Sequence, residues 1–229
     1  MIWRVRRVVT GHTAGGKSTF IIDGQAPNVM EMKSMPGLAL TDLWETTRAP
    51  ASNAGDADAA ARAVRLEPPR AGTIVRIVEF PPDAMWRGRA DAREAFESIQ
   101  AAHAPDASSH DPMMHKTNTV DYIIVLRGEI VAIMDIGETL LKAGDVLIQR
   151  GTNHSWSVRG NEPCVIAAVL VSADPLGGRA AKREPQHAAR GAMKRAARKP
   201  ARRPAARKAA KRAAPRKKAS GKAAARKRR

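Results

Sequence analysis

Cysteine is almost absent from this chain of 229 residues, which contains only Cys164. A single cysteine excludes an internal disulfide framework and a cysteine-based zinc site. Long hydrophobic runs are also missing, because no stretch approaches the roughly 18 apolar residues that a membrane-spanning helix requires. The N-terminal residues MIWRVRRVVTGH lack the apolar core and the cleavage site of a secretory signal. These absences predict a protein without a membrane span and favour a cytoplasmic location.

Acidic residues are nearly missing from the last part of the chain. Residues 179–229 contain 22 Lys or Arg and one acid, Glu184, so this segment carries a charge of +21. The whole chain has 40 basic and 22 acidic residues and a formal charge of +18, so residues 1–178 hold 18 basic and 21 acidic residues, or −3. A mildly acidic part of ordinary domain size is therefore followed by a strongly basic tail.

The tail predicts contact with polyanions. We expect a globular domain over 1–172, a linker over 173–178, and a disordered tail over 179–229, where Ala, Lys, Arg and Pro leave too few apolar side chains to offset the entropy of ordering. Such a charged segment predicts non-specific, salt-sensitive binding of duplex DNA, with RNA second, and hence association with the nucleoid. The tail has no aromatic residue, so stacking on single-stranded bases is not indicated. A role in solubility, contact with anionic lipid, and an extension without a role remain open alternatives.

The first 172 residues have the pattern of an antiparallel all-β fold, a sandwich or a barrel. Short β-branched runs alternate with Gly-containing turns, a long loop is expected over 46–70, and one short helix over Ala90–Ala102. The expected strands are Ile2–Val9, Thr19–Ile22, Thr73–Phe80, the pair within Thr119–Asp135, Glu138–Leu141, Asp145–Gln149, Ser155–Val158 and Val165–Val171.

Residues 11–18, GHTAGGKS, match the phosphate-binding pattern G-x-x-x-x-G-K-[ST]. That loop requires a helix to begin at its Lys-Ser pair, because the helix N-terminus contributes to anion binding. Here Ser18 is followed by the β run Thr-Phe-Ile-Ile and the turn Asp-Gly. We therefore interpret the segment as a glycine hairpin between two N-terminal strands.

The candidate site lies in residues 115–129, HKTNTVDYIIVLRGE. Residues two apart on a strand share a face, so His115, Thr117, Thr119 and Asp121 are expected to point the same way. If His154, after a later glycine turn, meets this strand inside the fold, it forms a two-His, one-carboxylate set with His115 and Asp121. Such a set with open positions suits Fe(II), and Mn, Ni or Zn are alternatives.

These segments resemble the two motifs of the cupin superfamily, in its small single-domain members. The spacing His115-x-Thr117-x3-Asp121-x6-Gly128 reproduces the first motif, with Thr117 in place of its second His and Asp121 in place of its Glu. Gly144, Gly151 and His154 match the second motif, although its Pro is missing, its gap is one residue short and Val158 replaces its Asn.

The resemblance covers most of 5–172 and none of the tail. It implies a double-stranded β-helix of the jelly-roll type and a divalent metal held by His115, Asp121 and His154. Thr117 would be a weak fourth ligand, because a hydroxyl replaces an imidazole. It also implies a pocket for a small organic molecule, and pairing into a homodimer, as is frequent among cupins. The basic tail is similar to those of histone-like proteins.

Two further residues near the motifs have alternative interpretations. Trp156 lies two residues beyond His154 and could stack on a flat ligand or pack in the core. Gln149 could orient a substrate or a metal-bound water, or it could satisfy a backbone group. Three functions stay open at this point. The chain could be a metal-dependent dioxygenase or isomerase, a metal-free ligand-sensing domain tethered to DNA, or a barrel that serves only packing or dimerisation.

Overall fold

The computed structural model describes residues 2–177. The predicted tail and the last residue of the predicted linker lie outside the described residues, so the expectations of disorder and nucleic-acid binding are not addressed by the structure. In the described part, no helix is both long and apolar enough to cross a membrane.

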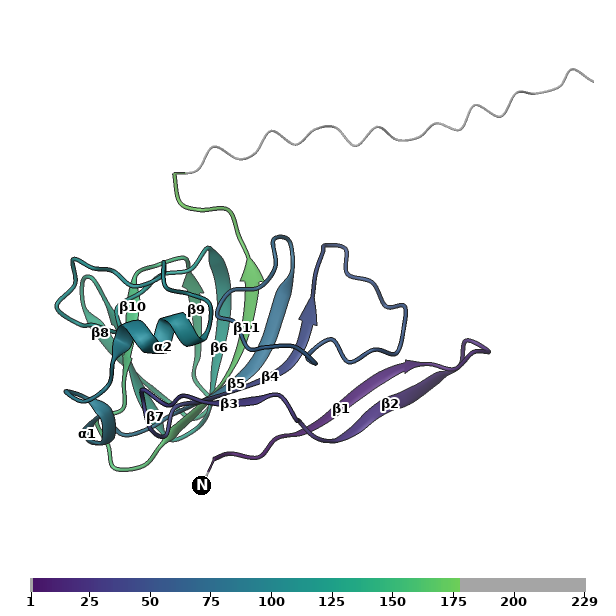
Figure 1. Ribbon diagram of the computed structural model, residues 1–229, viewed down its shortest axis with the longest axis horizontal. Coiled ribbons are helices and arrows are strands. Elements are labelled where there is room, and N and C mark those ends of the chain that lie inside the picture. Colours follow the sequence, from purple (N-terminus) through teal and green to yellow (C-terminus); the bar gives the residue numbers. More distant parts are fainter. Residues whose placement is uncertain (1, 178–229) are drawn as a thin grey trace, which may run out of the picture. The chain divides into compact units, whose positions relative to one another are not determined.

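Strands dominate the described residues, and the prediction of an all-β fold is confirmed (Figure 1). Two short helices, α1 (Asp83–Trp86) and α2 (Ala92–Ser98), lie between the fifth and sixth strands. The strands are β1 (Arg6–His12), β2 (Ser18–Gln25), β3 (Val29–Glu31), β4 (Ala39–Thr46), β5 (Thr73–Phe80), β6 (Thr119–Arg127), β7 (Glu129–Met134), β8 (Glu138–Lys142), β9 (Val146–Arg150), β10 (His154–Ser157) and β11 (Cys164–Ser172).

These strands form three antiparallel sheets. The largest has six strands in the order β3-β4-β5-β11-β6-β9, the second has the order β10-β7-β8, and β1 and β2 form a separate hairpin. Side chains from the six-stranded and three-stranded sheets, among them Val125 on β6, Ile166 on β11 and Ile130 on β7, belong to one buried cluster. The hydrogen-bonded ladders do not close into a barrel in the described residues, so only the all-β part of the predicted barrel fold is confirmed.

Strand β6 places polar and apolar side chains on the same inner face. Its inward residues are Thr119, Asp121, Ile123 and Val125, all at most 5% exposed, and they alternate with outward residues as a pleated strand requires. The buried carboxylate of Asp121 costs free energy unless it has partners. The polar half of β6 is therefore a candidate for a functional site.

Helix α2 is shorter than the expected Ala90–Ala102. It starts after Asp91, whose side chain accepts a hydrogen bond from the backbone N–H of Glu94, and it ends before Gln100, which has a φ of +58°. The helix buries Phe96 against the cluster shared by the two sheets.

Strand β4 was not predicted from the sequence. It is buried on both sides at Ala39–Asp42, and Thr41 and Asp42 interrupt the apolar pattern that reveals a strand. Of the long loop predicted over 46–70, residues 47–70 form no strand or helix, whereas Thr46 is the last residue of β4. Ion pairs hold this loop: Arg62 Nη1 lies 2.9 Å from Asp42 Oδ2, and Arg7 Nη2 lies 2.6 Å from Asp58 Oδ2.

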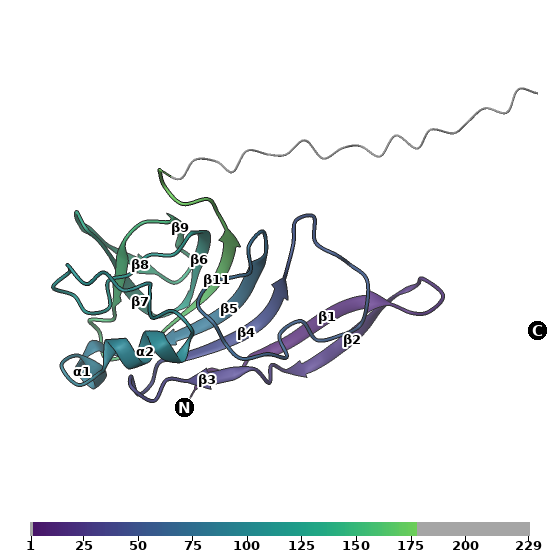
Figure 2. The ribbon, with the colours of Figure 1, turned by 45° about the horizontal axis from the view of Figure 1, so that its top comes forward.

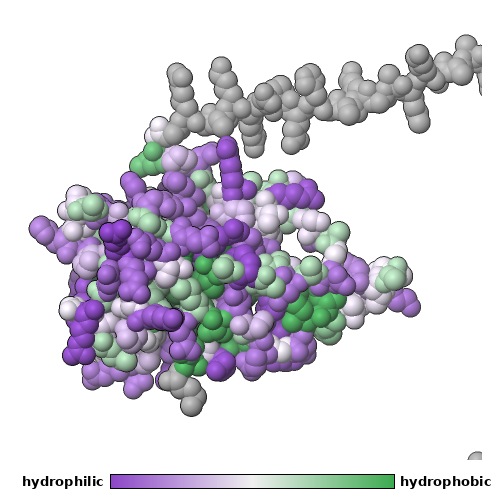
Figure 3. Space-filling model, viewed as in Figure 1, coloured by the Kyte–Doolittle hydropathy of each residue, from purple (hydrophilic) through white to green (hydrophobic). Residues whose placement is uncertain are grey.

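The motif GHTAGGKS forms the turn between β1 and β2, so the interpretation as a hairpin is confirmed. The Thr13 N–H donates to the Lys17 carbonyl, and Gly16 adopts a φ of +77° that favours glycine. Ser18 begins a strand and not a helix, which removes the helix N-terminus that a phosphate loop needs. The hairpin projects from the larger sheets in both ribbon views (Figure 2). Hydrophobic side chains gather over it on the face drawn in Figure 3, and Val8 and Phe20 are 43% and 70% exposed.

Candidate functional site

A cavity of about 130 Å³ lies within the cluster shared by the two larger sheets. Its walls are mostly apolar and come from the loop before β4, from β4, β5, β6 and β11, and from both helices. Its polar side chains are Arg76, Asp83, His115, Thr117, Asp121, Gln149 and His154. Its apolar walls include Met32, Leu40, Leu66, Trp86, Phe96, Ile123, Trp156 and Leu170. The cavity therefore has a wide apolar surface and a polar part, to which β6, β9 and β10 contribute Asp121, Gln149 and His154.

Backbone pairing brings the two predicted histidines together. The N–H of His115 donates to the carbonyl of His154 over 2.9 Å, and the N–H of His154 donates to the carbonyl of His115 over 2.8 Å. Side chains opposite each other in such a bridge are neighbours. The centroids of the two imidazole rings are accordingly 4.2 Å apart, with an angle of 48° between the ring planes.

Each imidazole is held by a backbone carbonyl. The Nδ1 of His115 lies 2.9 Å from the Met113 carbonyl oxygen, and the Nδ1 of His154 lies 3.0 Å from that of Thr152. A carbonyl can only accept, so Nδ1 carries the proton in both rings and Nε2 is left as the acceptor of the neutral form. Burial lowers the pKa of His115, and burial together with the neighbouring His115 lowers the pKa of His154 to about 3.

Gln149 connects His154 to Asp121. Gln149 on β9 and Asp121 on β6 are direct partners in the sheet. The Gln149 amide nitrogen donates to Asp121 Oδ2 over 3.1 Å and to His154 Nε2 over 3.0 Å. Burial raises the pKa of Asp121 to about 6, although hydrogen bonds from Thr119 and Gln149 and the charge of Arg76 act in the opposite direction. The polar part of the cavity is thus a continuous chain from a carboxyl group to an imidazole.

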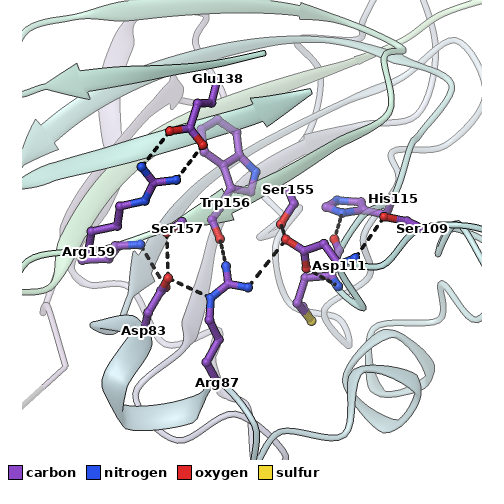
Figure 4. A network of polar contacts seen from close by, with 12 residues as sticks. Asp83, Arg87, Ser109, Asp111, His115, Glu138, Ser155, Trp156, Ser157 and Arg159 are labelled. Atoms are coloured by element: carbon purple, nitrogen blue, oxygen red, sulfur yellow. Dashed lines mark hydrogen bonds and ion pairs between the residues drawn. The ribbon is translucent and has the colours of Figure 1, made fainter. Parts of the chain in front are cut away.

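A polar network beneath β10 fixes the position of His115 (Figure 4). Asp111 accepts hydrogen bonds from the Ser155 hydroxyl over 2.8 Å and from the Met113 N–H over 2.9 Å. The carbonyl of the same Met113 holds the imidazole of His115. On the other side, Asp83 accepts from the Ser157 hydroxyl over 2.6 Å and from Arg87 Nε over 2.8 Å, which ties α1 to β10.

Most of the predicted site residues meet in the cavity. His115, Thr117, Asp121, Gln149, His154 and Trp156 all line it. Thr119 lies behind this lining, where its hydroxyl is 2.6 Å from that of Thr117. Sequence reasoning missed Arg76, which is 1% exposed, although a single Arg inside the apolar strand TIVRIVEF was the available signal. It also missed the apolar wall from residues 32–40 and from the two helices.

Known proteins resemble this chain in sequence. Residues 102–171 match the cupin domain family Cupin_2. Phomopsin biosynthesis cluster protein C' of Diaporthe leptostromiformis is 31% identical over 162 residues, which cover 68% of this chain and 71% of that protein. The chain belongs to the cupin superfamily.

Other cupins cover similar shares of the chain. The cupin-domain-containing oxidoreductase virC of Hypocrea virens is 29% identical over 180 residues, or 76% of this chain and 78% of that protein. Among solved structures, the Cnp3 cupin domain of Schizosaccharomyces pombe is 13% identical, with a TM-score of 0.37 over 74% of this chain and 83% of that one. A structural likeness of that size adds nothing on function.

The metal ligands expected of this cupin are only partly assembled. The two imidazoles lie side by side, but the Asp121 carboxylate reaches His154 through the Gln149 amide. Within residues 2–177, no three His, Cys, Asp or Glu side chains are grouped so as to hold a metal ion. As arranged, the residues do not fit a divalent cation. Binding of Fe, Mn, Ni or Zn by His115, Asp121 and His154 stays a prediction.

Proposed function

We propose that this cupin binds a small, mainly apolar organic molecule in the cavity and acts on it as an enzyme. The observation that carries the proposal is the combination of apolar walls with one polar part that holds two imidazoles, a carboxyl group and an amide. Ligand sites in proteins have this composition, in which apolar surface supplies affinity and a few polar groups fix orientation. Relatives described as cupin-domain-containing oxidoreductases support an enzyme of that class.

The size of the cavity limits the ligand. An apolar cavity of about 150 Å³ binds benzene in another protein. The cavity of about 130 Å³ described above therefore suits a group of about one ring. A longer substituent on such a molecule has to extend beyond the cavity.

The two imidazoles differ in what they can do for a ligand. The Nε2 of His154 already accepts a hydrogen bond from Gln149, whereas no hydrogen bond to the Nε2 of His115 is present within the described residues. We assign His115 the role of accepting a hydrogen bond or a proton from the ligand. Asp121, Gln149 and His154 then form the wall that orients the ligand, and Trp156 packs beside it at 5.8 Å between ring centroids from His154.

The remaining expectations belong to the same proposal. We infer that the sheets form the jelly-roll of a cupin, that two copies pair, and that residues 179–229 hold the protein on duplex DNA or RNA. The jelly-roll inference is supported by family membership, and the nucleic-acid inference by the charge of +21 on the tail. A metal-free sensing or structural domain tethered to DNA is the alternative to an enzyme.

Ligand binding can be tested with two substitutions on β11. Ala168 lines the cavity, while Ala167 faces the other side of the strand. We expect phenol, benzaldehyde or benzoate to change the tryptophan fluorescence of the protein saturably, because Trp86 and Trp156 line the cavity. Ala168→Leu should weaken binding by about tenfold or more by filling space, and Ala167→Leu should leave it unchanged. If the wild type shows no saturable response, or both variants bind alike, the cavity is not the ligand site.

A further inference from the structure

The Gln149 carboxamide occupies the position between Asp121 and His154 that a shared cation would need. One NH2 group reaches both of them, at 3.1 Å from Asp121 Oδ2 and 3.0 Å from His154 Nε2. An NH2 group has two hydrogens and can donate to two acceptors at once. It therefore satisfies a carboxylate oxygen and an imidazole lone pair in the way that a metal ion would.

The orientation of this amide follows from its partners. His154 has its proton on Nδ1, because that atom faces the Thr152 carbonyl, so Nε2 can only accept. If the amide were turned over, its oxygen would face a carboxylate oxygen and an imidazole lone pair, and three acceptors would meet without a proton. The NH2 group is thus fixed toward Asp121 and His154, and Gln149 is 4% exposed.

We propose that Gln149 takes the place of the metal ion in this cupin, and that its polar site works as a metal-free chain of hydrogen bonds from Asp121 to His154. The inference rests on the proposed function, because it concerns the same cavity. It assigns Gln149 the role of positioning the Asp121 and His154 side chains while leaving His115 open to the ligand.

The test is the metal content of the full chain, purified without a histidine tag, incubated with ZnCl2 or MnCl2 and then desalted. We expect the wild type to retain less than about 0.1 ion per chain. Gln149→Glu replaces the donor NH2 by a carboxylate oxygen, so two carboxylates and the imidazole of His154 come together, and we expect it to retain about one ion. The matched control Gln25→Glu adds the same charge at an exposed position and should behave like the wild type.

A second readout is the melting temperature with and without EDTA. The chelator should leave the wild type unchanged and lower the melting temperature of metal-loaded Gln149→Glu. A wild type that retains about one ion per chain overturns the inference. So does a folded Gln149→Glu variant that stays as empty as the wild type, because the amide is then not what excludes the metal. Neither result affects binding of the organic probes, so the two proposals can fail separately.

Discussion

Burial controls the chemistry of the individual residues at the site. It raises the pKa of Asp121 to about 6 and lowers the pKa of His154 to about 3, so it favours the neutral form of both groups. The two neutral imidazoles can then lie 4.2 Å apart without mutual repulsion. The same effect acts on the one cysteine, which the cavity does not use.

Cys164 is fully buried, and burial raises the pKa of its thiol to about 12. Only the thiolate reacts with disulfide reagents, and an unperturbed thiol has a pKa of 9.0. At pH 8 the native protein should therefore react with Ellman's reagent about a thousandfold more slowly than the protein in urea. Following the release of the coloured thiolate in both states measures this ratio. Equal rates would show that Cys164 is open to solvent in the native state.

At the scale of elements, ion pairs join β4 to the loop 47–72. Asp42 and Glu45 on β4 each pair with two arginines, and Arg62 of the loop contacts both carboxylates. The loop contributes the buried Val64 to the core and Leu66 to the cavity wall. Its position therefore depends on the ion pairs that hold it.

Removing one of these carboxylates should be costly. Asp42 is 0% exposed and lies 3.0 Å from Arg76 Nε and 2.9 Å from Arg62 Nη1. We expect Asp42→Asn to lower the free energy of unfolding by roughly 3–5 kcal/mol, because it leaves buried guanidinium groups without their partner. Urea denaturation measures this change. Asp23→Asn is the control, since Asp23 and Arg6 form an exposed pair on the hairpin, and it should have little effect. Similar losses for the two variants would contradict the role given to burial.

At the scale of the whole molecule, the basic tail and the cupin domain are expected to act separately. Lys and Arg side chains neutralise phosphates and release counterions, so binding of duplex DNA by residues 1–229 should weaken steeply as salt rises. Residues 1–178 carry a charge of −3 and should not bind. Filter binding of one labelled duplex at several salt concentrations compares the two chains. Equal affinity of the two chains for the duplex at low salt would show that the tail is not what binds DNA.

Local pattern was enough to predict most of the fold and the composition of the site. The expected strand Thr73–Phe80 coincides with β5. The two-residue period also placed Thr119 and Asp121 on one inner face, because side chains two apart on a strand point to the same side of the sheet. The meeting of His115 with His154 was expected only if their strands came together, and backbone pairing provides that contact.

The parts that escaped prediction depend on pairing between distant segments. The Gln149 amide lies between Asp121 and His154 because β9 pairs with β6 in one particular register, which the separate strands do not encode. Strand β4 was hidden because Asp42 finds its partners in Arg62 and Arg76, which lie 20 and 34 positions further along the chain. In a sequence, a charged residue suggests an exposed loop unless the partner that allows its burial is known.

The order of residues along β6 gives the cavity a direction. Of the residues on its inner face, Asp121 and Ile123 line the cavity, and Ile123 lies about 7 Å further along the strand than Asp121. Polarity therefore falls from one end of a single strand to the other. A ring with one polar substituent can point that substituent toward Asp121 and its apolar edge toward Ile123 in one sense only, so its reacting atom is chosen by orientation before any side chain acts on it.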